Sequence, residues 1–545
     1  MGMGIMEEVV LSGGISLFCM MVMMISMAAA AAVLGYVGRK LVMIWKKAGG
    51  RNNVNPTNWP VVGMLPGILQ NVYRIHEYVA EILIENGGTF EVKGSWLLPN
   101  LNFFLTCDPA NINYIFCQNF KNYPHGPHLK RIFDDAFGEG IINTDNELWE
   151  LHRKTTTPIM NNPRARALLE KKVTDKIRHG LLPLLERHVQ KRDALGMKQV
   201  FWQVTFDIAC IHLLERDPCT LDITEEDDNP FLKALQGGVN ALLYRHFLPE
   251  WSWKLQKWVF GVDREEKLTR DWKVFDHFIN PILSHRIHNN DGSNSNFSIL
   301  LSHINAHKGM TPQFLTDTFR ALLLTGSESN GITLTWLFWL LAKNPLVEAK
   351  ILDEIRRHQK QNDQQQVGKP SDGGNGNYKE QEEIFIFKEE ECQKLTYLHA
   401  AVCETLRLFP PLPLNHKVPT ERDVLPSGHV VTPNTKIIVS YYATGRMVSV
   451  WGEDCMEFKP ERWISPAGGG ILHQPSYKFP AFGSGPRSCI GREMSFTVIK
   501  MIAATILCHY RYELAEPCPS HHQPETFESI VLEMKDDLKV FFTHR

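Results

Sequence analysis

Near its C-terminus the chain carries a glycine-rich segment, residues 482–491 (FGSGPRSCIG), which contains a single cysteine at position 489. A helix-like apolar run follows directly. The glycines let the backbone turn tightly and approach a flat ligand closely. At a helix N-terminus the dipole and the free N–H groups stabilise a thiolate, so Cys489 is predicted to be a ligating cysteine.

A thiolate is the form of cysteine that binds iron, and as an axial ligand it favours O–O cleavage. The alternative is a glycine-rich loop around a buried, inert cysteine, which the pattern Phe482, Gly485, Arg487, Cys489 and Gly491 argues against. The segment resembles the haem-binding loop of the cytochromes P450. The resemblance implies heme b with Cys489 on the iron, Phe482, Gly485 and Gly491 against the cofactor, Phe482 also shielding the sulfur, and Arg487 paired with a propionate.

Two further motifs of that family lie upstream of the cysteine segment, in the order that the family has them. Glu404 and Arg407 form a Glu-x-x-Arg pair on a predicted helix, and Arg462 lies in the segment FKPERW at 458–463. Alone, such an i, i+3 pair is usually a solvated helix face. The resemblance implies a buried ion network that supports the haem loop, with a structural rather than a chemical role.

Trp149 and Arg153 match the family's Trp-x-x-x-Arg. A spacing of four puts the indole N–H and the guanidinium on one helical face, where both could donate to a carboxylate. The alternative is a core tryptophan beside a surface arginine. The resemblance implies that both residues bind a haem propionate.

The predicted helix 312–343 contains TGSESN at 325–330. The resemblance implies that Gly326 leaves room for dioxygen, and that Glu328 and Ser329 are the catalytic acid and alcohol that relay protons. Thr325 stands where the family usually has alanine, and Asn330 replaces a common second threonine. These departures put the standard relay in question, and a polar kink in a core helix is the alternative.

The N-terminus predicts a membrane anchor. Residues 9–38 carry no charge, a run longer than the roughly 20 residues that span a bilayer. A buried core helix or a cleaved signal peptide are the alternatives, but Glu7 and Glu8 precede the run and basic residues follow it. By the positive-inside rule we expect a lumenal leader (1–8), a transmembrane anchor (9–38), a basic and Pro-rich linker (39–69) and a cytosolic haem-thiolate domain (70–545) on the endoplasmic reticulum.

Beyond the linker the 3.6-residue period predicts a mainly α protein with a minor β portion, the cytochrome P450 fold behind a single transmembrane helix. Predicted helices span 74–86, 165–191, 312–343, 395–408 and 492–508, and predicted strands 89–92, 103–106 and 436–440. The polar segments 288–296 and 360–377 are predicted to be exposed loops.

Composition excludes some classes. The 11 cysteines form no Cys-x-x-Cys pair, which argues against structural zinc and a disulfide scaffold, so Cys117, Cys210 and Cys403 are predicted to be buried thiols. The net charge of −2 lacks the basic excess of a nucleic-acid binder.

Several stretches resemble the plant clan of fatty-acid ω-hydroxylases and midchain alkane hydroxylases, including DVLPSGH at 423–429 and VWGED at 450–454. In that fold the loop 122–143, the region 232–258 and the central helix line the substrate pocket. The aromatic residues of the second region are either ligand or membrane contacts or plain core residues: Phe247, Trp251, Trp253 and Trp258.

Three functions remain open. The first is a monooxygenase that hydroxylates an aliphatic chain of an alkane or fatty acid. The second is a phenol-coupling oxidase that forms C–C bonds in alkaloid metabolism, and the third is an isomerase or lyase, against which the retention of Glu328 and Ser329 argues. The first two need electrons from NADPH through a separate reductase, because the chain shows no flavin- or nucleotide-binding segment. The expected partners are therefore this reductase, the membrane and a hydrophobic small molecule.

Overall fold

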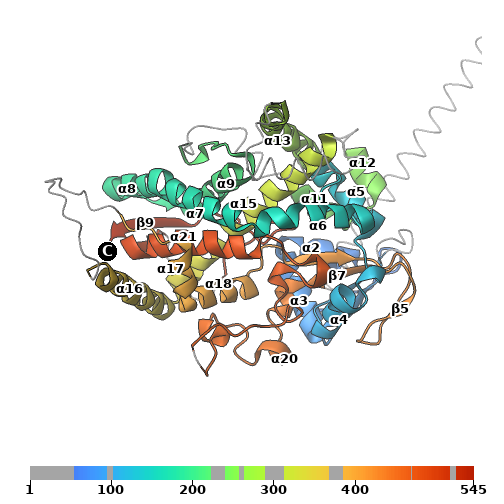
Figure 1. The fold of residues 1–545 in the computed structure, drawn as a ribbon. Coiled ribbons are helices and arrows are strands. Elements are labelled where there is room, and N and C mark those ends of the chain that lie inside the picture. The colour runs from blue at the N-terminus through green and yellow to red at the C-terminus, as the bar shows by residue number, and fades with distance from the viewer. Residues whose placement is uncertain are drawn as a thin grey trace, which may run out of the picture. The chain divides into compact units, whose positions relative to one another are not determined.

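The computed structural model describes residues 54–94, 102–222, 240–256, 263–288, 312–367, 384–467, 469–515 and 523–545. The predicted leader, the predicted anchor and the start of the linker lie outside these residues. Among the residues described, no helix is long and apolar enough to cross a membrane. Residues 56–545 form one compact unit, in which helices predominate over small sheets, as the sequence predicts (Figure 1).

The helices are α2 (Leu65–Gln70), α3 (Ile75–Glu85), α4 (Pro109–Asn113), α5 (Gly126–Phe137), α6 (Asn146–Asn161), α7 (Pro163–Lys176), α8 (Leu182–Lys191), α9 (Met197–Leu214), α11 (Asn240–Arg245), α12 (Glu250–Leu255), α13 (Asp263–His288), α15 (Pro312–Lys343), α16 (Pro345–Val367), α17 (Glu389–Lys394), α18 (Thr396–Leu408), α19 (Tyr441–Thr444), α20 (Val448–Trp451) and α21 (Arg492–His509). The strands are β1 (Thr89–Val92), β2 (Phe103–Thr106), β3 (Leu195–Gly196), β4 (Leu414–Lys417), β5 (Asp423–Val424), β6 (Val430–Val431), β7 (Lys436–Ser440), β8 (Tyr510–Leu514) and β9 (Lys539–His544).

The strands form three small sheets. The largest has the order β1-β2-β7-β4, with β2 and β7 parallel and the other pairs antiparallel. A second sheet has the order β3-β9-β8, and β5 pairs with β6. β7 is buried along its whole length, which explains why its apolar run KIIVS reads as a strand without alternation.

The predicted helix 165–191 is two helices in the structure. A π-helical turn, Ile177–Leu181, joins α7 to α8. Pro183 lies in the first turn of α8, and a proline has no N–H to continue an upstream helical hydrogen-bond ladder. The segment predicted as a basic and Pro-rich linker also contains a helix, α2. Pro66 lies in its first turn, where proline is tolerated.

Three segments predicted as loops contain helix where the structure describes them. α16 extends to Val367, so the start of the segment 360–377 is helix, with Lys360 and Gln361 exposed. Lysine and glutamine are good helix formers and need no buried face. α13 likewise reaches His288, and α5 occupies most of the predicted pocket loop 122–143. The rest of both low-complexity segments lies outside the described residues.

Helix α15 runs through the middle of the unit (Figure 1). It packs along α9 on one side and against α18 and α21 on the other. Trp336 is fully buried, stacks on Phe409 with ring centroids 3.9 Å apart, and donates from its indole N–H to the Leu532 carbonyl at 2.8 Å. This core fixes α15 above the C-terminal helix that follows the cysteine loop.

The predicted ion network is present and buried. Arg407 donates to both carboxylate oxygens of Glu404 at 2.7 Å, and Arg462 Nε reaches the same carboxylate at 3.2 Å. The Trp463 indole N–H also donates to Glu404, at 2.8 Å. The side chains of Glu404 and Arg407 are 0% exposed, so each charge depends on the others for compensation.

The network reaches the cysteine loop through aromatic rings. Trp463 packs edge-on against Phe479 with centroids 4.6 Å apart, and Phe479 lies beside Phe482. Phe482 in turn contacts Phe496 of α21 at 5.3 Å. The Glu404 carboxylate therefore supports the loop that carries Cys489.

Replacement of Glu404 by alanine should destabilise the protein strongly. It leaves the Arg407 guanidinium buried without its carboxylate, a loss of about 3–5 kcal/mol of unfolding free energy. The matched control is Glu81→Ala, which breaks the exposed pair with Arg74 and should cost about 1 kcal/mol or less. Denaturant unfolding of the full chain measures both, and equal small losses would contradict a stabilising role for the network.

Candidate active site

The cysteine loop is built from short turns that lead into α21. Two 3-10 turns, Pro480–Phe482 and Gly485–Arg487, precede the cysteine, and the Cys489 N–H donates to the Phe482 carbonyl at 2.7 Å. Gly485 has φ +66°, and a Cβ there would lie 1.9 Å from the Phe116 carbonyl oxygen. In the described structure this glycine is therefore required by the close approach of the segment Tyr114–Gln118.

Cys489 lies two residues before Gly491, the N-cap of α21. Part of the residue is exposed to solvent. The surrounding protein removes water from the sulfur, and this desolvation raises the pKa of the thiol. The backbone N–H groups of Gly491 and Arg492 and the guanidinium of Arg153 act in the opposite direction and stabilise the thiolate. A cation at the sulfur, such as iron, would complete the deprotonation that these donors favour.

Arg487 and Trp149 lie against each other in the structure. The Arg487 guanidinium lies over the Trp149 ring at 4.5 Å from its centroid. It donates to Asp145 at 2.7 Å and to the Thr144 carbonyl at 2.8 Å, and its Nε is buried without a hydrogen-bond partner in the described structure. Burial lowers the pKa of Arg487 to about 10.

Arg153 approaches the cysteine loop itself. It lies one helical turn after Trp149 on α6, and its Nη1 donates to the Ser488 carbonyl at 2.5 Å. Trp149 and Arg153 thus both lie against residues 487–488, the first through Arg487 and the second through Ser488. Whether either binds a propionate remains the prediction that the resemblance implies.

Lys417, which the sequence reasoning missed, lies beside these groups. Its ammonium is fully buried, has no hydrogen-bond partner among the described residues, and lies over the rings of Phe116 and Phe120. Burial and the nearby Arg487 charge lower its pKa well below the usual lysine value, and Asp145 opposes this shift. The one signal in the sequence was a lysine inside the apolar stretch after α18. Such a lysine is weak evidence for a binding site when no charged partner can be identified from the sequence.

This pocket carries an excess of buried positive charge. Arg487 and Arg153 contribute two cations and Lys417 a buried amine whose charged form is disfavoured, whereas Asp145 is already bonded by Arg487 and by the N–H groups of His125 and Gly126. Uncompensated buried cations are costly. A ligand with carboxylates here and a metal at Cys489 would satisfy both needs, so the residues present fit a haem.

One face of α15 is open. Thr325 is exposed although its helix is otherwise central, and a Cβ at Gly326 would meet no atom within 4 Å. Ser329 lies one turn further on the same face and donates to the Thr325 carbonyl at 2.7 Å. Residues 325, 326 and 329 therefore border free space, as expected for a position over a cofactor.

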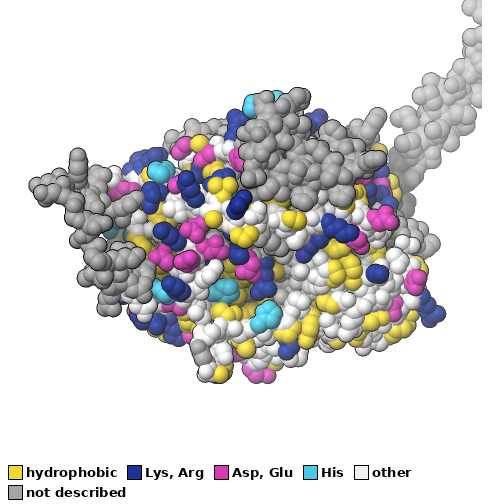
Figure 2. All heavy atoms as spheres, in the orientation of Figure 1, with side chains coloured by type: hydrophobic (Ala, Val, Ile, Leu, Met, Phe, Trp, Pro, Cys, Tyr) yellow, Lys and Arg dark blue, Asp and Glu magenta, His cyan; other side chains and the backbone are white. Residues whose placement is uncertain are grey.

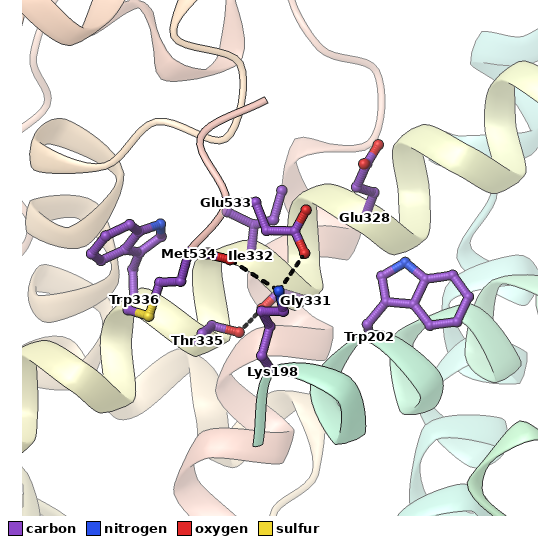
Figure 3. Close-up of a pocket in the computed structure, with 9 residues that line it drawn as sticks. All are labelled: Lys198, Trp202, Glu328, Gly331, Ile332, Thr335, Trp336, Glu533 and Met534. Atoms are coloured by element: carbon purple, nitrogen blue, oxygen red, sulfur yellow. Dashed lines mark hydrogen bonds and ion pairs between the residues drawn. The ribbon is translucent and has the colours of Figure 1, made fainter. Parts of the chain in front are cut away.

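Glu328 points to a different side of α15 from Ser329. It lines a small cavity of about 20 Å³ between α15, α9 and the segment before β9 (Figure 3). No hydrogen bond or ion pair joins it to another described residue, and burial together with the like charge of Glu533 raises its pKa to about 8. The structure therefore does not join the two predicted relay residues directly. Thr325 is three residues from Glu328 and four from Ser329, so it neighbours both on the helix surface.

Of the aromatic residues singled out in the region 232–258, two are buried and one is exposed. Phe247 and Trp253 are buried, Trp251 is 63% exposed, and Trp258 lies outside the described residues. Among the cysteines, Cys210 and Cys403 are buried as predicted. Cys117 is exposed, because its neighbours Ile115 and Phe116 take the buried positions of the turn.

A mainly helical fold in which a cysteine loop, a buried cationic pocket and an open central helix come together is that of a haem-thiolate protein. The sequence matches the cytochrome P450 family over residues 54–540, and the chain belongs to this family. It is therefore an oxidoreductase of the monooxygenase type, for which the family implies haem-thiolate iron and electrons from a reductase.

The chain is similar to plant members of the family. It is 38% identical over 499 residues to the alkane hydroxylase MAH1 of Arabidopsis thaliana, covering 90% of this chain and 93% of that protein. It is also 38% identical over 490 residues to noroxomaritidine synthase of Narcissus aff. pseudonarcissus MK-2014, covering 89% and 90%. Cytochrome P450 86B1 of Arabidopsis thaliana is 32% identical over 495 residues, covering 89% and 85%. The predicted resemblance to the plant hydroxylase clan is confirmed.

The charge of Lys417 can be tested through haem retention. Lys417→Met removes a buried amine without a hydrogen-bond partner from the apoprotein. It also removes a donor to a bound carboxylate, so haem should dissociate roughly 10- to 100-fold faster. Lys436→Met is the control, because Lys436 is also buried but donates to the His246 carbonyl at 2.9 Å. Haem transfer to an excess of a haem acceptor measures both rates, and an unchanged rate for Lys417→Met would remove this residue from the site.

Proposed function

We propose that this P450 hydroxylates an aliphatic chain of a hydrophobic substrate, an alkane or a fatty acid. The observation that carries the proposal is the open face of α15, where Thr325, Gly326 and Ser329 border free space in an otherwise packed helix. The similarity to the alkane hydroxylase MAH1 over most of both chains supports this substrate class.

In this proposal Cys489 ligates the iron of heme b, with Phe482, Gly485 and Gly491 against the cofactor. Trp149, Arg153, Arg487 and Lys417 would hold its carboxylates. When bound, the haem supplies the activation of dioxygen, and thiolate ligation favours O–O cleavage. Electrons come from NADPH through a separate reductase.

The chain's own residues handle the protons. The raised pKa of Glu328, about 8, keeps this carboxyl protonated at neutral pH, so that it can donate. Thr325 and Ser329 carry hydroxyls on the open face, and Thr325 neighbours Glu328 on the helix surface. Thr325, a departure from the family pattern, therefore offers a bridge from the acid to the open face.

We place the protein on the endoplasmic reticulum as a single-pass protein with residues 9–38 as its anchor. The lack of charge from Val9 to Gly38 and the basic residues after it support this location. On the face shown in Figure 2, basic and acidic side chains are interspersed over the described surface, in keeping with partners other than nucleic acid.

Glu328→Gln should slow turnover while haem content stays unchanged. The amide keeps the shape of the side chain but cannot donate a proton as an acid does, so we expect a loss of about 100-fold or more in kcat. The measurement is product formation per haem with reductase present. Full activity in this variant would exclude Glu328 from the relay.

A phenol-coupling oxidase is the second candidate, and a histidine cluster favours it. His128, His246 and His416 lie with ring centroids 5.8–6.0 Å apart, and four of their ring nitrogens are buried without a partner in the described structure. Burial holds the pKa of His128 at about 4, so the ring is neutral. Each unpaired buried polar group costs roughly 1–3 kcal/mol. A phenol or amine would satisfy them and an alkane would not, and noroxomaritidine synthase is among the similar proteins.

Product mass separates the two functions. Microsomes with a reductase are given an alkane, a fatty acid and a phenolic amine. Gain of one oxygen on the aliphatic chain supports the hydroxylase, and loss of two hydrogens from the phenol makes the protein a coupling oxidase. His416→Leu should weaken use of the phenolic substrate and spare the alkane.

A further inference from the structure

The small cavity beside Glu328 has both polar and apolar walls, and it joins three distant parts of the chain. Lys198 comes from the first turn of α9, Glu328 and Thr335 from α15, and Glu533 from the segment before β9 (Figure 3). A volume of about 20 Å³ holds roughly one water, and such a water needs two to four polar partners. The carboxyls, the ammonium and the Thr335 hydroxyl provide them.

The charges in this cavity are unequal. Two carboxyls share one lysine, and that lysine is committed to Glu533: Lys198 Nζ lies 3.1 Å from the Glu533 carboxylate and donates to the Met534 carbonyl at 2.9 Å. Asp537 adds further negative charge and accepts from the Lys198 backbone N–H at 2.8 Å. Glu328 is left without a cation, so the proton of the cluster resides on Glu328 and the negative charge on Glu533.

Glu533 also has access to solvent. Its side chain is 18% exposed and that of Lys198 is 15% exposed. Figure 3 shows Glu533 and Lys198 facing one another, with Glu328 further along α15 and set apart from this pair. The cluster therefore extends from the protein surface to the residue that we propose as the proton donor.

We propose that Glu533, positioned by Lys198, passes protons from solvent to Glu328 through a single water in this cavity. The inference rests on the proposed function of Glu328. After Glu328 gives up its proton, Glu533 takes a proton from bulk water and the cavity water transfers one to the Glu328 carboxylate. The cluster returns to its starting state, and one solvent proton enters for each proton delivered.

A purely structural role is the alternative. The Lys198–Glu533 pair could serve just to fasten the C-terminal segment to α9, next to the hydrogen bond from the Met197 N–H to the Leu538 carbonyl at 2.9 Å. If the pair has a structural role alone, its mutation should lower the stability of the protein without changing the solvent isotope effect on turnover. The experiment therefore needs a readout of proton transfer as well as one of stability.

The kinetic test uses full-length holoenzyme with its reductase. For Glu533→Gln we expect kcat to fall about 10-fold with little change in KM, because proton supply becomes slow, and the solvent hydrogen isotope effect on turnover to rise. Glu533→Asp keeps a carboxyl and should recover part of the rate. The control is Glu525→Gln, which breaks the exposed pair with Lys535 on the same segment at 2.8 Å and lies outside the cavity.

A stability readout checks the coupling without activity. Glu328 has a folded pKa of about 8 against an ordinary value of 4.5, so folding takes up a proton in this interval. The stability of the parent protein relative to Glu328→Gln should therefore fall as pH rises from about 4.5 to 8. In a Glu533→Gln background the upper end of this window should move to lower pH, because the like charge is gone.

The outcomes distinguish the two claims. If Glu328→Gln slows turnover while Glu533→Gln changes neither kcat nor the isotope effect, the supply route is overturned and the role of Glu328 stands. If Glu328→Gln is itself fully active, the proposed relay fails as well. An unmoved pH window in the Glu533→Gln background would also overturn the coupling.

Discussion

The buried carboxylate of Glu404 is the interaction on which the rest of the site depends. It accepts from Arg407, Arg462 and the Trp463 indole, which come from α18 and from the turn after residue 458. Both charged partners also bind backbone carbonyls, Arg407 that of Cys455 at 2.6 Å and Arg462 that of Trp451 at 2.7 Å. A long irregular segment is thereby held rigid, and the cysteine loop packs against it through Phe479 and Phe482.

The two sides of the site differ in the sign of their charged groups: basic groups predominate near the cysteine loop, and carboxyls predominate beside α15. Beside the loop, the Arg487 guanidinium is paired with Asp145, whereas the buried Lys417 amine has no hydrogen-bond partner among the described residues. Beside α15, Glu328 and Glu533 leave more carboxyl than cation. The first imbalance suits an anionic cofactor, and the second suits retention of a proton. Both proposed roles rest on incomplete charge compensation at these positions.

Much of this could be predicted from the sequence. The strands 89–92, 103–106 and 436–440 and the helix 312–343 have the predicted bounds. The strands are short runs rich in aromatic and β-branched residues, and the helix carries a long 3.6-residue period. The Glu404 network was also predicted, since the family resemblance implies it from the spacing of Glu404, Arg407 and Arg462. The contact of Arg153 with the Ser488 carbonyl was not predicted. The predictions were wrong in two places: a π-helical turn before Pro183 divides one predicted helix, and the start of the polar segment 360–377 is helical.

The remaining site residues could not be predicted for a physical reason. Three of these residues are far from the motifs in sequence: Lys417, Lys198 and Glu533. Each is identified as a site residue by a charged group that the fold brings beside it. A lone lysine in a strand or a glutamate near the C-terminus has no spacing that marks it. Glu328 was predicted, but its orientation toward α9 rather than toward Ser329 depends on the packing of three elements.

The central claim is that Cys489 ligates the haem iron as a thiolate. X-ray absorption at the iron edge of the purified holoprotein tests it most directly. The account predicts a sulfur neighbour of the iron that disappears in Cys489→Ser and persists in Cys117→Ser, an exposed cysteine outside the loop. A sulfur neighbour that survives in Cys489→Ser, or an iron with no sulfur in the parent protein, would contradict the account.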